Sequence, residues 1–402
     1  MDLTRRLRLL FLVPFAPRAG ARHGGARVTG QLIAGLALRH DVAVLYLADD
    51  AEPAPDEELV ERCSIVEAVR RPSGPATLRT RARSKLRLLR GFPTWASELA
   101  SPQFGRRVSE LAAEWRADVV QLEFPVMGQY VPALAAFAAP RVLVDHDASL
   151  RDLRDWGGPL GRIVAALDER AWRRFERRVI EAVQAVVVFT ERDRRALEGL
   201  GTTTPVLEIP FGVPLPEAPL SPAGTSPPSV LFVGNFRHNA NTDAAVWLGR
   251  TLFPPVRAAR PDARLTIIGA SPTPEVLALA NDSVCVPGKV PEVAPYMDQA
   301  AVVAAPIREG GGMRVKVLEA LAAGKAVVAT PLAVAGLGVT AGEQLEIAAS
   351  AEEFSRALQR LLQDESRRRE LAESARAWAR EHLGWGEAIA RYERLYAELT
   401  AR

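Results

Sequence analysis

The residues best suited to chemistry lie in one stretch, AVVAAPIREGGGMRVKVLEALAAGKAVVATPLAVAGL. Its pattern predicts a buried strand at 301–305, a glycine loop at 310–312, a helix at 313–323 and a second strand at 326–330. Glycines between a strand and a helix let backbone N–H groups approach a ligand, and a helix N-terminus favours an anion. Arg314 and Lys316 add two cations in the first turn, where the helix dipole disfavours positive charge. With Glu319 further along as an acceptor for hydroxyls, the pattern indicates a site for a nucleotide sugar.

The same stretch also fits an ordinary strand–helix–strand unit whose glycines only allow close packing, and pattern alone does not separate the two interpretations. Lysine usage favours the anion site. The chain holds 51 Lys and Arg residues but only four lysines, and Lys289, Lys316 and Lys325 all fall near this loop. A chain so biased towards arginine is expected to keep lysine where a compact ammonium group suits the site.

Composition excludes several classes of protein. The 402 residues are enough for two domains, and 48% apolar with 25% charged residues is ordinary for a globular α/β protein. Cys63 and Cys285 have no metal-ligand spacing, which indicates a reducing cytosol. No apolar run is long enough for a transmembrane helix, and the N-terminal RRLRLLFLV is interpreted as a strand, not a signal peptide. The expected location is therefore cytoplasmic.

The chain repeats one plan twice, in which buried strands alternate with helices. This alternation predicts two Rossmann-like α/β domains that face each other across a cleft, with ligands at the carboxyl ends of the strands. The expected strands are 7–13, 42–47, 119–122, 142–144 and 185–189 in the first half, and 230–233, 265–268, 284–286, 302–304 and 326–329 in the second. A helix is expected at 241–252.

Prolines mark the boundary between the halves. Residues 210–228 contain seven prolines, which excludes a helix or a central strand. We therefore predict domains at 1–209 and 230–384, a linker at 210–229 between them, and a final amphipathic helix within 385–402.

These motifs together resemble the family 4 (group 1) glycosyltransferases of the GT-B fold. The family pattern P-x-x-x-G-x-G followed by L-E-A-x-A-x-G-x-x-V-V-A-T is matched by Pro306 to Gly312 and by Leu318 to Thr330. Residues 230–248 resemble a subgroup with N-x-D-A-x-x-W after the first strand of its donor domain, and 265–291 resembles its L-x-I-x-G and G-x-V-P elements. The resemblance implies that the first domain binds the acceptor and the second binds a nucleoside diphosphate sugar. It also implies that the last helix packs back on the first domain.

The resemblance assigns roles to residues. Glu319 would hold the ribose, Gly288, Lys289 and Val290 would flank the base, and loop amides with Lys316 would hold the diphosphate and sugar. The implied catalytic residues are His146, Arg314, Lys316 and Glu319, and the implied donor-binding residues are Gly24, Gly25, Gly234, Arg237, Gly288, Lys289, Val290, Glu309, Gly310, Gly311, Gly312 and Met313.

One position departs from the family pattern, in which two glutamates are separated by seven residues. Counting back from Glu319, the first of them falls on Gly311. Glu309 lies two residues earlier and matches no family position. Backbone amides or Glu309 are therefore candidates to replace the missing carboxylate.

His146 lies just beyond the strand at 142–144, where the family carries a histidine near the reacting sugar. The alternative is that His146 or Asp147 only caps the next helix. Glu123, at the end of the strand at 119–122, is expected to point into the same cleft. Thr190 and Glu191 are expected to begin a helix.

Residues 70–90 carry eight cations and no acid. One interpretation is a solvated loop. Because the segment also holds four leucines, the second interpretation is contact with the anionic inner face of a membrane. Nucleic acid is not an expected partner, because no aromatic residues alternate with the cations.

The resulting prediction is a retaining, metal-independent glycosyltransferase without a cofactor. It would move a sugar from a nucleoside diphosphate sugar to a glycan, a lipid-linked acceptor or a small molecule, in cell-surface polysaccharide or glycoconjugate synthesis. Two alternatives stay open: a nucleotide-sugar epimerase of the same fold, and a non-catalytic member that binds nucleotide sugar. A Rossmann dehydrogenase is disfavoured because neither first turn carries G-x-G-x-x-G followed by a ribose-binding acid.

Overall fold

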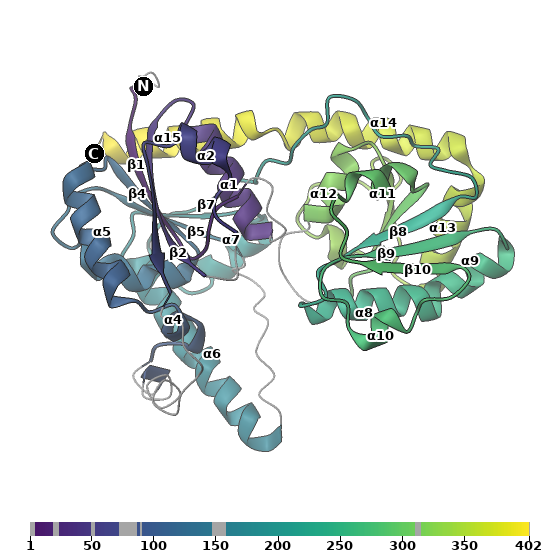
Figure 1. The fold of residues 1–402 in the computed structure, drawn as a ribbon, viewed down its shortest axis with the longest axis horizontal. Coiled ribbons are helices and arrows are strands. Elements are labelled where there is room, and N and C mark those ends of the chain that lie inside the picture. Colours follow the sequence, from purple (N-terminus) through teal and green to yellow (C-terminus); the bar gives the residue numbers. More distant parts are fainter. Residues whose placement is uncertain are drawn as a thin grey trace. The chain divides into compact units, whose positions relative to one another are not determined.

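The computed structural model describes residues 5–18, 24–49, 53–71, 87–88, 91–146, 158–309 and 315–401, with side chains left undescribed at 158–160. Contacts divide the chain into two compact units. Unit 1 comprises residues 1–212 and 385–402, and unit 2 comprises residues 213–384. Each unit is a parallel sheet flanked by helices (Figure 1).

Unit 1 is built on a seven-stranded sheet in the order β3-β2-β1-β4-β5-β6-β7. Its inner strands are buried on both faces, which is why the sequence shows them as continuous apolar runs. The strands are β1 Arg8–Val13, β2 Asp41–Ala48, β3 Ile65–Arg70, β4 Val119–Glu123, β5 Arg141–Asp145, β6 Ala185–Val188 and β7 Val206–Glu208. The helices are α1 Gly24–Leu36, α2 Glu57–Arg62, α4 Thr94–Glu98, α5 Pro102–Trp115, the 3₁₀ helix Pro125–Leu134, α6 Gly158–Glu181, α7 Glu191–Glu198 and α15 Trp385–Thr400.

Unit 2 is built on a six-stranded sheet in the order β10-β9-β8-β11-β12-β13. The strands are β8 Ser229–Val233, β9 Arg264–Ile268, β10 Val284–Gly288, β11 Val302–Ala305, β12 Ala326–Ala329 and β13 Glu346–Ile347. The helices are α8 Asn239–Trp247, the π-helical turn Leu248–Leu252, α9 Phe253–Ala259, α10 Pro274–Leu277, α11 Ala294–Gln299, α12 Val315–Ala322, the 3₁₀ turn Leu332–Val334, α13 Ala351–Gln363 and α14 Glu365–His382. Within the described ranges, no helix is long and apolar enough to cross a membrane.

Every strand expected from the sequence is present, and the described residues add β3, β7 and β13. All three additional strands lie at a sheet edge. An edge strand is only partly covered, so it carries mixed polar and apolar residues and lacks the apolar run that reveals a central strand.

The helix expected at 241–252 differs from the prediction at both ends. Helix α8 begins at Asn239, and after a π-helical turn the chain continues as α9 to Ala259. Pro254 and Pro255 stand in the first turn of α9, where a missing N–H costs no hydrogen bond. These prolines therefore do not end the helical path.

The proline-rich segment 213–228, which is most of the predicted linker, groups with unit 2 and is hydrogen-bonded to it. Prolines leave carbonyl oxygens without helix or sheet partners, and buried cations of unit 2 supply the donors. Arg368 and Arg376 of α14 donate to carbonyl oxygens within 216–223 at 2.6 to 3.1 Å. Leu220 N–H donates to the carbonyl of Ala323 at 2.8 Å.

Lys325 is the third of these buried cations. Its Nζ donates to the carbonyl oxygens of Ser221 and Asp298, the latter at 3.2 Å. Burial lowers the pKa of its ammonium group to about 8. Lys325 therefore joins the proline-rich segment to the end of α11 by hydrogen bonds to two carbonyl oxygens. The expectation that its clustering with other lysines marks an anion site is wrong for this residue.

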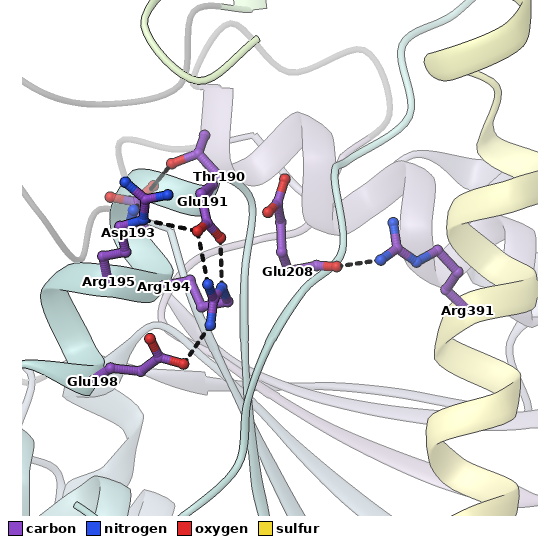
Figure 2. A network of polar contacts seen from close by, with 8 residues as sticks. All are labelled: Thr190, Glu191, Asp193, Arg194, Arg195, Glu198, Glu208 and Arg391. Carbon is purple, nitrogen blue, oxygen red and sulfur yellow. Dashed lines mark hydrogen bonds and ion pairs between the residues drawn. The ribbon is translucent and has the colours of Figure 1, made fainter. Parts of the chain in front are cut away.

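The C-terminal helix α15 belongs to unit 1, where it packs against α1 (Figure 1). Trp385 Nε1 donates to Gln31 Oε1 at 3.2 Å. Figure 2 shows a second anchor, in which Arg391 donates to the carbonyl of Glu208 at 2.6 Å. A third is the ion pair between Glu393 and Arg39 at 2.9 Å.

The surroundings of His40 predict that the stability of the α15 contact depends on pH. The ring is buried, its Nδ1 accepts from the N–H of Leu7 at 3.3 Å, and its Nε2 lies 3.3 Å from Glu393 Oε1. Burial, opposed by Glu393, lowers the pKa of His40 below its ordinary 6.5. Because the unfolded chain then binds more protons than the folded one as pH falls through 6.5, this contribution to stability is present above pH 6.5 and lost below it.

We therefore expect the wild type to lose more stability between pH 7.5 and pH 5.5 than the variant His40→Gln. Chemical denaturation at both pH values measures the difference, and His382→Gln, at an exposed histidine, is the control. An equal loss in wild type and His40→Gln would contradict the assignment.

Candidate functional site

The carboxyl ends of β8, β9 and β10 in unit 2 are marked by glycines. Each strand ends at or directly before a glycine, namely Gly234, Gly269 and Gly288. Gly234 N–H donates to the carbonyl of Ile268 at 3.0 Å, and Gly269 N–H donates to the carbonyl of Gly288 at 2.8 Å. A Cβ on Gly269, whose φ is +154°, would stand 1.6 Å from the carbonyl oxygen of Gly234. Only glycine permits this close approach of two strand ends.

The loops that follow β8 and β9 are joined beside these strand ends. Phe236 N–H donates to the carbonyl of Ala270 at 3.0 Å. Arg237, which is exposed, donates from Nε to Ser271 Oγ at 3.3 Å. Ser271 has φ +54°, a conformation that costs energy for a residue with a side chain and that is concentrated at functional sites.

The loop after β10 lies at the same carboxyl-terminal end of the sheet. Gly288 is buried with φ +74°, Lys289 is exposed, and Val290 packs partly against the core. The structure thus brings Gly234, Arg237 and the 288–290 loop to the carboxyl-terminal end of the same sheet, where the ligands of such sheets bind.

Helix α12 carries the charged residues of the predicted site. Its buried face includes Val317, Leu318 and Ala320, so Glu319 emerges between core residues and is only 17% exposed. Lys316 Nζ donates to Glu319 Oε2 at 2.7 Å. The cation expected at the phosphates and the acid expected at the ribose are therefore partners of each other. The predicted residues Gly310, Gly311, Gly312, Met313 and Arg314 lie outside the described residues.

Arg308, just before the glycine loop, binds to helix α8. Its guanidinium contacts both carboxylate oxygens of Asp243, at 2.5 and 3.1 Å, and lies 4.4 Å from the centroid of the Trp247 ring. Asp243 and Trp247 are four residues apart and so share one helix face. The D-A-x-x-W spacing thus forms the binding surface for Arg308, a contact that the motif alone does not reveal because Arg308 lies 65 residues away from Asp243. The next residue, Glu309, is exposed.

We expect this contact to affect donor binding through the loop. Arg308→Gln loses both the ion pair and the cation–π contact, so its donor affinity should fall about fivefold, and Asp243→Asn, which loses only the ion pair, should fall less. Titration calorimetry on both single variants and the double variant measures the coupling. Arg369→Gln, which removes an exposed ion pair with Glu365, is the control. If the losses of donor binding free energy in the two single variants add up to the loss in the double variant, Arg308 and Asp243 do not act together.

His146 in unit 1 directly follows β5 and is fully buried. Its Nε2 lies 2.7 Å from Oε2 of Glu123, which ends the neighbouring strand β4. The ring stacks on Phe124 with centroids 3.9 Å apart and meets Phe189 edge-on at 4.8 Å. Glu123 is fully buried, and its carboxylate lies among hydrogen-bond donors. Asp147 lies outside the described residues.

Gly24 and Gly25, which the resemblance places among the donor-binding residues, are the first two residues of helix α1. Gly25 is buried with Ala26, Thr29 and other residues of the same helix.

The turn after β6 begins helix α7, as expected. Thr190 is its N-cap, with Oγ1 accepting from the N–H of Asp193 at 3.2 Å. Glu191 bonds Arg194 and Arg195 (Figure 2), and these bonds lower the pKa of its carboxyl to about 2. The pair Thr190–Glu191 is thus confirmed as a helix start.

The described ranges hold no group of three His, Cys, Asp or Glu side chains that converges as a metal site would. Of the basic segment 70–90, only residues 70, 71, 87 and 88 are described. Arg71 there pairs with Asp49 at 3.4 Å and donates to the carbonyl of Pro14 at 2.7 Å.

Two Rossmann-like units, each a parallel sheet flanked by helices, are the architecture of the GT-B class of proteins. Two family profiles match the sequence: "Glycosyl transferase 4-like domain" over residues 23–212 and "Glycosyl transferases group 1" over residues 227–364. The chain belongs to the group 1 glycosyltransferases of the GT-B fold, and it is therefore an enzyme that transfers a sugar.

Solved structures confirm the fold. Sucrose-phosphate synthase from Thermosynechococcus elongatus is similar with a TM-score of 0.72 at 18% identity, over 99% of this chain and 100% of that one. HepE from Anabaena, solved with UDP and glucose, is similar with a TM-score of 0.65 at 14% identity, over 98% and 100%. Trehalose 6-phosphate synthase from Burkholderia multivorans is similar with a TM-score of 0.63 at 14% identity, over 99% and 98%. No curated protein matches the sequence significantly.

Proposed function

We propose that this glycosyltransferase moves a sugar from a nucleoside diphosphate sugar, bound by unit 2, to an acceptor hydroxyl, with retention of the anomeric configuration. One observation carries the proposal: Lys316 and Glu319 lie together on α12, in the unit whose strands β8, β9 and β10 end at or directly before glycines. A ligand with phosphates at one end and hydroxyls at the other engages both side chains. HepE, a structural neighbour, was solved with UDP and glucose, which supports a nucleotide sugar.

In this mechanism the charge that grows on the departing diphosphate is stabilised by Lys316 and Arg314 and by loop amides. Glu319 accepts hydrogen bonds from the ribose hydroxyls. The acceptor hydroxyl attacks from the face of the leaving group, which gives retention. The proposal includes neither a bound metal nor a cofactor.

The acceptor is proposed to bind unit 1. A glycan, a lipid-linked glycan or a small molecule all fit the class, and the neighbour TarM, solved with fondaparinux, α-GlcNAc-glycerol and UDP, supports a glycan. A role in polysaccharide or glycoconjugate synthesis, in the cytoplasm and at the inner membrane face through residues 70–90, belongs to the same proposal.

Thermal denaturation with UDP-, GDP-, dTDP- and ADP-sugars tests the donor. A ligand that binds only the folded chain at a hundred times its Kd adds about 2.7 kcal/mol of stability. We expect one nucleotide class to raise the Tm of the wild type and of Glu381→Ala, at an exposed position of α14, but not of Glu319→Ala. No shift with any donor would contradict the proposal.

Product analysis with the donor so found distinguishes the reaction. Transfer to an added glycan, with the anomeric configuration kept, is the expected result. Conversion of the donor sugar in the absence of any acceptor would instead identify an epimerase.

A further inference from the structure

A buried polar network joins four elements of unit 1 at the carboxyl ends of β4 and β5. Tyr396 of α15 donates its hydroxyl to Gln121 Oε1, and Gln121 Nε2 donates to Glu123 Oε1 at 2.6 Å. Thr29 of α1 donates to Glu123 Oε2 at 3.1 Å. His146 Nε2 lies 2.7 Å from the same oxygen, Oε2.

The order of donors in this network assigns the proton on His146. The Tyr396 hydroxyl occupies the oxygen of the Gln121 amide, so its NH₂ group faces Glu123. A carboxylate only accepts hydrogen bonds, so His146 must donate to it from Nε2–H. In the neutral ring, Nδ1 is then left with a lone pair.

Nδ1 of His146 is buried and has no hydrogen-bond partner among the described residues. Buried polar atoms almost always have a partner, so Nδ1 is an acceptor of this network that a hydroxyl donor would satisfy. The ring is also held in direction, because it is stacked on Phe124 with 10° between planes and abuts Phe189 at 89°.

We propose that Glu123 is a positioning residue that holds His146 in the Nε2–H tautomer and so presents Nδ1 as the acceptor for a hydroxyl of the bound sugar substrate. The substrate in this inference rests on the proposed function, but the tautomer does not. Helix α15 takes part in this positioning through Tyr396. The Tyr396 hydroxyl orients the Gln121 amide, which in turn orients the Glu123 carboxylate.

Glu123→Gln is the direct test. An amide in place of the carboxylate presents an NH₂ group to His146, which must then accept at Nε2 and carry its proton on Nδ1. We expect nitrogen NMR of the ¹⁵N-histidine-labelled full chain to show Nε2–H for His146 in the wild type and Nδ1–H in Glu123→Gln. The chain has five histidines, so His146→Gln assigns the signal.

A second pair of variants keeps the test valid if Glu123→Gln does not fold. Tyr396→Phe removes the hydroxyl that fixes Gln121, whereas Tyr392→Phe removes one that has no hydrogen-bond partner among the described residues. We expect a shifted, faster-exchanging His146 Nε2–H signal in Tyr396→Phe alone. Equal spectra in these two variants, or an unchanged tautomer in Glu123→Gln, would overturn the inference.

Kinetics separate positioning from a merely structural role. Glu123→Gln should lower kcat/KM for sugar transfer about tenfold or more, as loss of a hydrogen bond to a charged group does, and should alter the pH profile. Unchanged kcat/KM and pH profile alongside the switched tautomer would overturn the role in presenting Nδ1 to substrate. A wild type that shows the Nε2–H tautomer but transfers no sugar would instead refute the proposed function and leave the Glu123 assignment supported.

Discussion

Replacing Gly269 by alanine is expected to cost about 3–5 kcal/mol of unfolding free energy, the largest loss we predict for any single substitution in unit 2. The new Cβ would stand 1.6 Å from the carbonyl oxygen of Gly234 and meet a backbone conformation, φ +154°, that side chains rarely adopt. Because β8 and β9 are neighbours in the sheet, relief of the clash must separate their ends. Donor binding at the carboxyl ends of β8 and β9 should be lost when these two ends separate.

Chemical denaturation of Gly269→Ala measures this cost, and Gly338→Ala is the matched control. Gly338 also has positive φ, +70°, but a Cβ there meets nothing within 4 Å. The control should lose only about 1–2 kcal/mol from backbone strain. If both variants lose the same stability, the close approach of the two strand ends is not what requires glycine at position 269.

Replacing Glu319 by alanine is expected to weaken donor binding about 100-fold while leaving the fold intact. Two ribose hydroxyls donating to one carboxylate contribute about 3 kcal/mol in total, since each hydrogen bond to a charged group contributes at least about 1.5 kcal/mol. Stability should change little, because the ion pair with Lys316 lies at a partly exposed position. Titration calorimetry with the preferred donor measures the affinity.

The control for Glu319→Ala is Glu381→Ala, which removes an exposed acid from α14. Its donor affinity should equal that of the wild type. An affinity of Glu319→Ala within twofold of the wild type would remove Glu319 from the donor site.

The central strands could be predicted from the sequence because burial on both faces makes them continuous apolar runs. The edge strands could not, since Glu67 in β3 and Glu346 in β13 show how an edge admits charge. The GT-B fold followed from the alternation of strands and helices and from the family motifs. Where the proline-rich segment lies could not be predicted, because it depends on carbonyl acceptors meeting Arg368 and Arg376 from residues far along the chain.

The candidate site was predictable only where its contacts are local in the sequence. Lys316 and Glu319 were found because local spacing on one helix brings them together. The pairs Arg308–Asp243 and His146–Glu123 were missed because each joins separate elements, and only the order of strands in a sheet makes them neighbours. Lysine counting misled at Lys325, since composition does not distinguish a phosphate ligand from a cation buried against carbonyl oxygens.

The measurement that tests the donor site most directly is hydrogen–deuterium exchange of the full chain with and without saturating nucleoside diphosphate of the preferred class. We predict slower exchange in unit 2, at the loops after β8, β9 and β10 and at the start of α12. Protection confined to unit 1, with these loops unchanged, would contradict the assignment of the donor site to unit 2.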